Sequence, residues 1–118
     1  LAKTKEAAGI KVLASPVAAA DMPALRNQSE LVLGKLGSGV VVLGAVAGDK
    51  VNLVATVSKD LVAKGIHAGK IIGAVARIAG GGGGGRPDMA QAGGKDPAKL
   101  DEALELAARL VEEQISGR

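Results

Sequence analysis

The sequence predicts an α/β domain: a mixed β-sheet flanked by helices, with a glycine-rich loop before the C-terminal helix. Three observations lead to this prediction. Short Val-rich runs alternate with segments of helical periodicity. A length of 118 residues fits a single domain. Six consecutive glycines, residues 80–85, separate the last two helical patterns, where a loop is expected.

The N-terminal residues predict a helix end followed by a strand. Residues 1–8 hold good helix formers, so we expect them to be the end of an N-terminal linker helix. The globular domain then spans residues 9–118. Residues 10–14, Ile-Lys-Val-Leu-Ala, predict its first short strand.

A helix and a hairpin are expected next. Asp21 is placed to cap a helix that Gly37 ends. Residues 39–47 are almost continuously apolar, as in a strand covered on both faces. A Gly-Asp turn leads from them to a second strand, residues 51–57. If the strands before and after the helix are parallel, their connection is expected to be right-handed.

The C-terminal half predicts helices. Ser58 is placed to cap a short helix, and residues 68–79 follow a 3.6-residue period. Asp96 and Pro97 suit the cap and first position of the last helix. The buried stripe predicted for this last helix consists of Leu100, Leu104, Ala107, Val111 and Ile115.

Composition excludes several classes of function. Phe, Trp and Tyr are absent, so only arginine planes and His67 could stack on a base. Cysteine is absent, which excludes disulfides, thiolate nucleophiles and Cys-based zinc sites. No apolar run approaches the ~20 residues of a membrane helix. We therefore expect a cytoplasmic protein that binds no membrane, with no catalytic or metal-binding residues in these 118 positions.

Charge is unevenly distributed along the chain. Residues 1–95 hold twelve basic and six acidic residues, whereas residues 96–118 hold three basic and six acidic ones. The basic part contains the glycine run, which suits a polyanionic partner. An ordinary solvated surface is the alternative interpretation of the same charges.

The glycine run is the candidate binding site. We expect the backbone N–H groups of Gly82, Gly83, Gly84 and Gly85 to cradle an anion, with Arg86 as a clamp. The run lacks the GK[ST] ending and the preceding strand of a nucleotide-binding P-loop, which excludes that class. A flexible linker is the structural alternative.

Other polar residues join this candidate site. Asp88 is expected to pair with Arg86 or to cap the backbone rather than to bind a metal. Gln91 is a candidate for reading a base edge or for satisfying the loop backbone, and the sequence leaves both open. Lys59, Lys70 and Arg77 are candidate phosphate contacts, with solvated side chains as the alternative for each.

The string GGRPDMAQAGG, residues 84–94, is the most specific motif of the chain. Together with VVVLGAVAGDKVNLVATVSKDL upstream, it resembles the C-terminal domain of alanyl-tRNA synthetases, from the DHH-associated group. The resemblance covers nearly all of residues 9–118. In the phosphoesterase branch of that group the glycine run ends in histidine; Arg86 stands there in this chain, which favours the synthetase branch.

The resemblance implies a non-catalytic domain that binds the elbow of tRNA-Ala and helps couple aminoacylation with editing. It implies the aminoacylation and editing domains as partners, and ATP, Mg²⁺ and Zn²⁺ as cofactors of those domains, not of this one. It also suggests a short edge strand over residues 89–92. Two alternatives are a dimerisation module, using an uncovered Ile71/Val75/Ile78 helix face, and a substrate-holding accessory domain of a DHH phosphoesterase.

Overall fold

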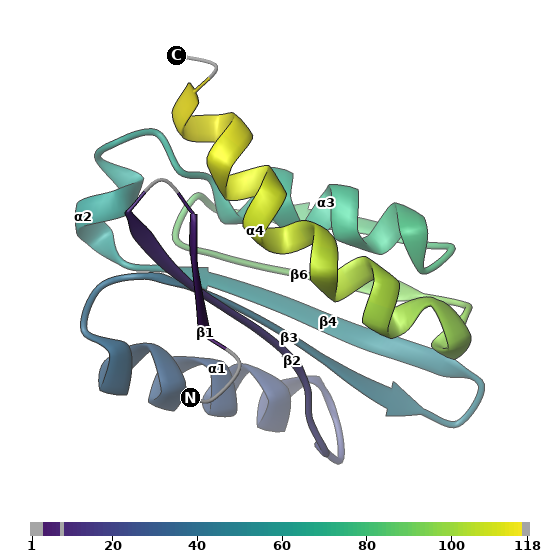
Figure 1. Cartoon of the computed structure of the whole chain (residues 1–118). Coiled ribbons are helices and arrows are strands. Elements are labelled where there is room, and N and C mark those ends of the chain that lie inside the picture. The colour runs from purple at the N-terminus through teal and green to yellow at the C-terminus, as the bar shows by residue number, and fades with distance from the viewer. Residues whose placement is uncertain (1–3, 8, 117–118) are drawn as a thin grey trace.

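A computed structural model describes residues 4–7 and 9–116, and this part of the chain forms one mixed six-stranded sheet between two layers of helices. One helix covers one face and two helices cover the other (Figure 1). The predicted α/β class with a mixed sheet is therefore confirmed. In chain order the elements are β1 Thr4–Ala7, β2 Ile10–Pro16, α1 Met22–Leu36, β3 Val40–Ala47, β4 Lys50–Val57, α2 Lys59–Val62, α3 Ala68–Ile78, β5 Gly82–Gly85, β6 Met89–Gly94, a 3₁₀ turn Pro97–Lys99 and α4 Leu100–Ser116.

The strands lie in the order β1-β2-β3-β4-β6-β5. The β2–β3 pair is parallel, because α1 carries the chain back between them, and every other pair is antiparallel. The predicted hairpin is confirmed as β3–β4, with Val40 opposite Val57 at one end and Ala47 opposite Lys50 at the other. Strand β6 pairs with β4, and β5 pairs with β6, so the glycines of β5 lie at an edge of the sheet.

The larger core lies between the sheet and the α3/α4 layer. From α3 it takes Ile71, Ile72 and Val75, all with no exposed surface, and from α4 it takes Leu104 and Val111. These α4 residues belong to the predicted stripe, in which Ile115 is partly buried. A smaller core on the other face joins α1 to the strands of β2, β3 and β4. Its members are aliphatic, as the composition requires.

The start of α1 follows its predicted cap. The Asp21 carboxylate accepts a hydrogen bond from the Ala24 N–H at 2.9 Å, which satisfies one of the free donors of the first turn. Gly37 ends the helix with φ of 79°, a left-handed conformation that glycine adopts without a Cβ penalty.

The N-terminal prediction is wrong for the residues that the structure describes. Residues 4–7 form strand β1, antiparallel to β2, whereas residues 1–3 and 8 lie outside the described part. Helix propensity amounts to a few tenths of a kcal/mol per residue, so pairing along the edge of β2 overrides it. Residues 4–7 therefore belong to the sheet, and the predicted separation of residues 1–8 from the domain does not hold for them.

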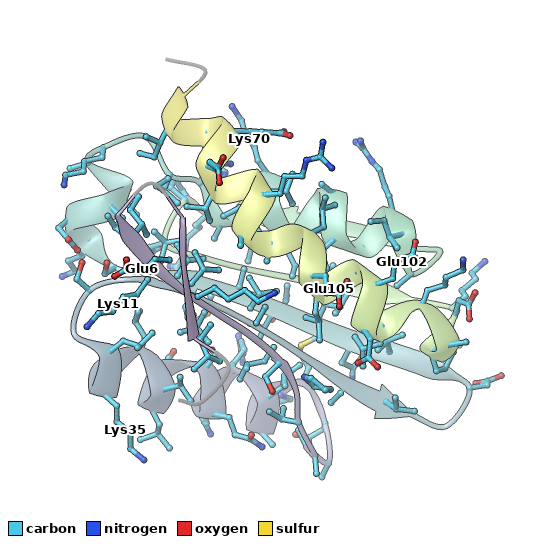
Figure 2. All side chains as sticks on the ribbon, viewed as in Figure 1. Glu6, Lys11, Lys35, Lys70, Glu102 and Glu105 are labelled. Atoms are coloured by element: carbon cyan, nitrogen blue, oxygen red, sulfur yellow. The ribbon has the colours of Figure 1, made fainter. Side chains whose placement is uncertain are left out.

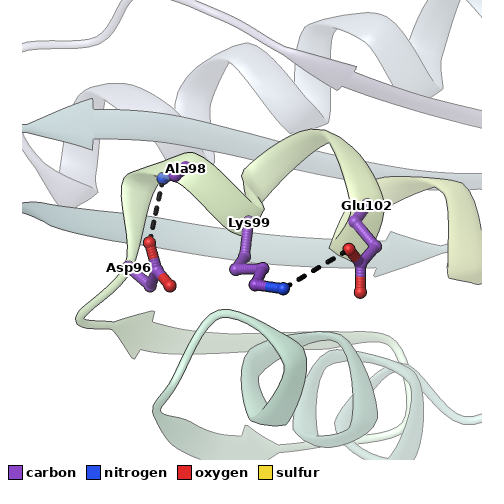
Figure 3. Close-up of polar contacts among 4 residues, drawn as sticks. All are labelled: Asp96, Ala98, Lys99 and Glu102. Atoms are coloured by element: carbon purple, nitrogen blue, oxygen red, sulfur yellow. Dashed lines mark hydrogen bonds and ion pairs between the residues drawn. The ribbon is translucent and has the colours of Figure 1, made fainter.

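The entry to α4 matches the Asp-Pro signature, with one added turn. Asp96 accepts a hydrogen bond from the Ala98 N–H at 3.1 Å, and Pro97 begins a 3₁₀ turn (Figure 3). Lys99 then lies 3.7 Å from Glu102 across the junction with α4. Because a 3₁₀ turn is wound more tightly than an α-helix, the α-helix itself begins at Leu100.

Candidate nucleic-acid interface

The last four residues of the glycine run form a strand and not a loop. Residues 82–85 form β5, which pairs antiparallel with β6 so that Gly84 lies opposite Gln91 and Gly82 opposite Gly93. The expected edge strand over residues 89–92 is the longer β6, which lies inside the sheet between β4 and β5. Successive N–H groups of a strand point in opposite directions, so the expected convergence of four of them on one anion is wrong.

The glycines of β5 fall into two sets. A Cβ added at Gly83 would lie 2.4 Å from the Ala92 Cβ, and one at Gly85 would lie 3.0 Å from the Ala90 Cβ. Added Cβ atoms at Gly82 and Gly84 would meet nothing within 4 Å. Packing thus explains the glycine at 83 and disfavours a side chain at 85, but it gives no reason for glycine at 82 or 84.

Helix α3 packs closely on one side of the β5–β6 hairpin. A Cβ added at Gly69 would lie 2.7 Å from the Gly85 carbonyl oxygen, and one at Gly73 would lie 3.4 Å from the Gly83 carbonyl oxygen. The helix therefore lies almost in backbone contact with β5. Covering an edge strand with a helix is one way to protect its unpaired backbone groups from other chains.

The opposite side of the hairpin is open. Gln91 lies on the sheet face opposite α3, next to Gly84 and across from Val54, and its side chain is exposed. Gly82 and Gly84 share this face, because directly paired residues of an antiparallel ladder point the same way. Three of the predicted site residues thus share one open face, on which Gln91 carries a side chain and the two glycines do not.

The turn that follows β5 is anchored by three backbone hydrogen bonds. The Arg86 N–H donates to the Met89 carbonyl at 3.0 Å and closes the hairpin. The Ala68 N–H donates to the Pro87 carbonyl at 2.8 Å, and the Val57 N–H donates to the Asp88 carbonyl at 2.9 Å. The turn is therefore fixed to the start of α3 and to the end of β4.

This anchoring brings predicted cations together. Lys70 follows Ala68 by two residues on α3, and Lys59 follows Val57 by two residues at the start of α2. Both lysines are exposed, as is Arg86. The structure thus gathers Lys59, Lys70 and Arg86 around one end of the sheet, a grouping that their sequence separation did not reveal.

Arg77 lies further along the same helix. It is exposed, seven residues after Lys70, and seven residues of α-helix advance about 10 Å and nearly two turns. The two side chains are therefore on the same outer side of α3. Figure 2 shows Lys70 near the C-terminal end of α4, with Glu102 and Glu105 toward the other end of that helix.

Arg86 and Asp88 form the predicted internal pair. The Arg86 Nε lies 3.3 Å from the Asp88 Oδ1, with 73% and 48% of the two side chains exposed. The interpretation of Asp88 as a partner of Arg86 is confirmed. Among the described residues, no group of three His, Asp or Glu side chains is placed to hold a metal ion.

Two contacts that sequence reasoning missed hold the neighbouring elements. The Gln114 Oε1 accepts from the His67 N–H at 3.0 Å, and the Gln114 Nε2 donates to the His67 carbonyl at 3.3 Å. The His67 Nδ1 in turn accepts the Lys70 N–H at 3.2 Å as the cap of α3. A glutamine on the last helix carries no local signal that it will clamp a residue 47 positions earlier.

The second missed contact joins α2 to the residues just before β3. The Ser38 hydroxyl donates to the Asp60 carboxylate at 2.6 Å. This hydrogen bond, and then one from Ser58, lower the pKa of Asp60 below its usual 3.8. The Ser58 hydroxyl also accepts from the Gly39 N–H at 3.0 Å, and it makes no side-chain cap bond to α2.

The molecule also has a groove away from the predicted site. A cavity of about 320 Å³ lies between α4 and the first two strands, floored by Val12 and Leu104 and edged by Lys5, Asp101 and Glu105. Its two carboxylates disfavour a polyanion. No helix within residues 4–7 and 9–116 has the length and apolar character to cross a bilayer.

The chain is similar to known proteins in both sequence and structure. Residues 9–113 match the model of the DHHA1 domain. The chain is 58% identical over 117 residues to an alanine–tRNA ligase of Acetivibrio thermocellus, covering 99% of this chain and 13% of that protein. It is 60% identical over 104 residues to an alanine–tRNA ligase of Bacillus subtilis, covering 88% of this chain and 12% of that protein. The crystal structure of the C-Ala domain from Aquifex aeolicus alanyl-tRNA synthetase superposes with a TM-score of 0.83 at 32% identity, over 93% of this chain and 98% of that one.

Proposed function

We propose that this chain, which belongs to the DHHA1 domain family, is the C-terminal tRNA-binding domain of a cytoplasmic alanine–tRNA ligase. It spans 13% of the first relative's length, so aminoacylation and editing are assigned to the rest of such a protein. In this proposal the domain contacts the elbow of tRNA-Ala and helps present one tRNA to both reactions. ATP, Mg²⁺ and Zn²⁺ are assigned to those other domains.

The observation that carries the proposal is the grouping at one end of the sheet. Lys59, Lys70 and Arg86 lie around a turn that three backbone hydrogen bonds fix in place. A turn with a fixed backbone suits phosphate groups of a folded RNA, because less backbone conformational entropy is lost on binding. Folded RNA is read largely by shape and backbone, which a domain without aromatic residues can do.

The open glycines support the same surface. Glycine inside a strand costs about 0.5–1 kcal/mol relative to alanine, and packing gives no reason for it at Gly82 or Gly84. Close approach of a ligand to the backbone gives such a reason. We therefore include Gly82, Gly84 and Gln91 in the interface, next to the Arg86 turn.

The test is tRNA-Ala binding by the 118-residue chain across a salt series. Arg86→Ala should weaken binding about tenfold and lower the salt dependence by about one phosphate contact. Arg26→Ala, which removes an exposed charge on α1, is the matched control and should leave the affinity unchanged. Binding by the folded chain that is absent, or that does not weaken with salt, contradicts the proposal.

The open face is tested separately. Gly84→Val should keep the fold, because an added Cβ meets nothing within 4 Å, while the variant places a bulky group on the open face. Gly34→Val, at an α1 position that also has nothing within 4 Å, is the matched control. Weaker tRNA binding confined to the Gly84 variant would place the RNA on this face; equal binding would remove the face from the interface.

The helix face that the sequence offered for dimerisation is not available at the surface. Ile71 and Val75 have no exposed surface and Ile78 is partly buried, so that helix face is covered by the domain itself. One large apolar side chain, Leu31 on α1, is 68% exposed. Sedimentation of wild type and Leu31→Ser tests it: a concentration-dependent dimer lost in the variant would favour dimerisation through α1.

A further inference from the structure

Asp88 is an unexpected residue in a surface proposed to bind a polyanion. It places a carboxylate 3.3 Å from the guanidinium of Arg86, the cation of the turn itself. At that distance the carboxylate offsets part of the attraction between the guanidinium and a phosphate that approaches from solution. A turn evolved only to attract phosphates would gain from having no acid at this position.

The fold does not require the Asp88 side chain. The turn is held by backbone atoms: the Asp88 carbonyl accepts from Val57, the Pro87 carbonyl accepts from Ala68, and the Arg86 N–H donates to Met89. The exposed Arg86–Asp88 pair adds little stability, since exposed ion pairs are worth about 0–1 kcal/mol. The carboxylate is therefore free to serve recognition.

The pair presents a donor group and an acceptor group side by side. The 3.3 Å contact uses the Nε of Arg86, and the guanidinium carries four further N–H donors on its two terminal nitrogens. The carboxylate accepts hydrogen bonds only. A bare phosphate satisfies the guanidinium and is repelled by the carboxylate, whereas a phosphate next to a hydroxyl or amino donor satisfies both.

We infer that Asp88 is a specificity-determining residue, which makes the Arg86 turn select a phosphate flanked by a hydrogen-bond donor, as in RNA, over the phosphates of DNA. The ribose 2′-hydroxyl supplies such a donor at every nucleotide of RNA and is absent from DNA. This inference rests on the proposed function. Asp88 raises selectivity by weakening binding to generic polyanions.

The test compares two probes, tRNA-Ala and a single-stranded oligothymidylate of similar length, across wild type, Asp88→Asn and Asp88→Ala. Asparagine keeps the shape and removes the charge. Both variants should bind the DNA about three- to tenfold more tightly, and the ratio of tRNA affinity to DNA affinity should fall. Asp49→Asn, an exposed acid at the far end of β4, is the matched control and should leave the ratio unchanged.

A double-mutant cycle separates recognition from structure. In the Arg86→Ala background, Asp88→Asn should change DNA affinity much less, because the charge that the carboxylate screens is gone. A rise of DNA affinity that is equal in both backgrounds would overturn the inference. Unchanged DNA affinity in both single variants would overturn it too, while tRNA binding by wild type would leave the proposed function standing. Absence of tRNA binding by folded wild type would instead remove the proposed function, and this inference with it.

Discussion

On the face of the β5–β6 hairpin that α3 covers, a Cβ at Gly83 would lie 2.4 Å from the Ala92 Cβ; on the opposite face, a Cβ at Gly84 would meet nothing within 4 Å. Neighbouring residues of one glycine run thus face two environments. The covered face is explained by packing, since an added Cβ at Gly83 would meet Ala92 of β6 and one at Gly69 of α3 would meet the Gly85 carbonyl oxygen. On the open face no packing contact requires glycine, and this contrast separates structural glycines from candidate binding glycines.

The largest expected effect breaks the covered face. Gly83→Ala should destabilise the domain by about 3 kcal/mol, because the methyl group would overlap the backbone and side chain of Ala92. Gly84→Ala should leave the free energy of unfolding unchanged or raise it by up to about 1 kcal/mol, through a less flexible unfolded chain. Urea unfolding of both variants measures the contrast, and equal losses would contradict the division into two sets.

The next effect concerns the helix that covers this face. Gln114→Ala removes both side-chain hydrogen bonds to the His67 backbone and leaves a part-buried N–H and carbonyl without these partners. We expect a loss of about 1–2 kcal/mol in the free energy of unfolding. Hydrogen exchange should show faster opening at the start of α3 than at the start of α1; a uniform change would argue against a local clamp.

A smaller effect tests the helix on the other face. Asp21→Ala removes the cap bond to the Ala24 N–H and should cost about 1 kcal/mol. Because α1 packs on strands β2, β3 and β4 and not on the β5–β6 hairpin, tRNA binding by the folded variant should be unchanged. Weaker binding by the Asp21 variant would extend the interface to the α1 layer.

The smallest effect is a pH dependence at the α2 start. The pKa of Asp60 is lowered below 3.8 mainly by the Ser38 hydroxyl, so the folded state favours the charged carboxylate. Its contribution to stability is present above 3.8 and is lost as pH falls through the lowered folded value. Ser38→Ala should therefore lower the urea midpoint slightly at about pH 7 and converge with wild type at about pH 2. If the urea midpoints of the variant and of wild type still differ in acid, the effect comes from the serine alone and not from the charge of Asp60.

Much of the fold was predictable because its determinants are local. The Asp21 and Gly37 boundaries of α1, the β3–β4 hairpin and the Asp96-Pro97 entry to the last helix depend on residues adjacent in the chain. The sequence also predicted that Asp88 pairs with Arg86, and the structure confirms this pair. Both belong to one four-residue turn, where sequence neighbours must be spatial neighbours.

The sequence by itself determined an aliphatic α/β domain with a basic part, an acidic last helix and one glycine run. Tertiary structure alone decided that residues 4–7 extend the sheet and that the run is a strand, because pairing with β2 and with β6 outweighs weak local preferences. It also decided which glycines face α3, and that the segments that carry Lys59 and Lys70 are hydrogen-bonded to the Arg86 turn. Those arrangements depend on hydrogen bonds and packing between separate helices and strands, such as the bond from the Val57 N–H to the Asp88 carbonyl, for which no local pattern exists.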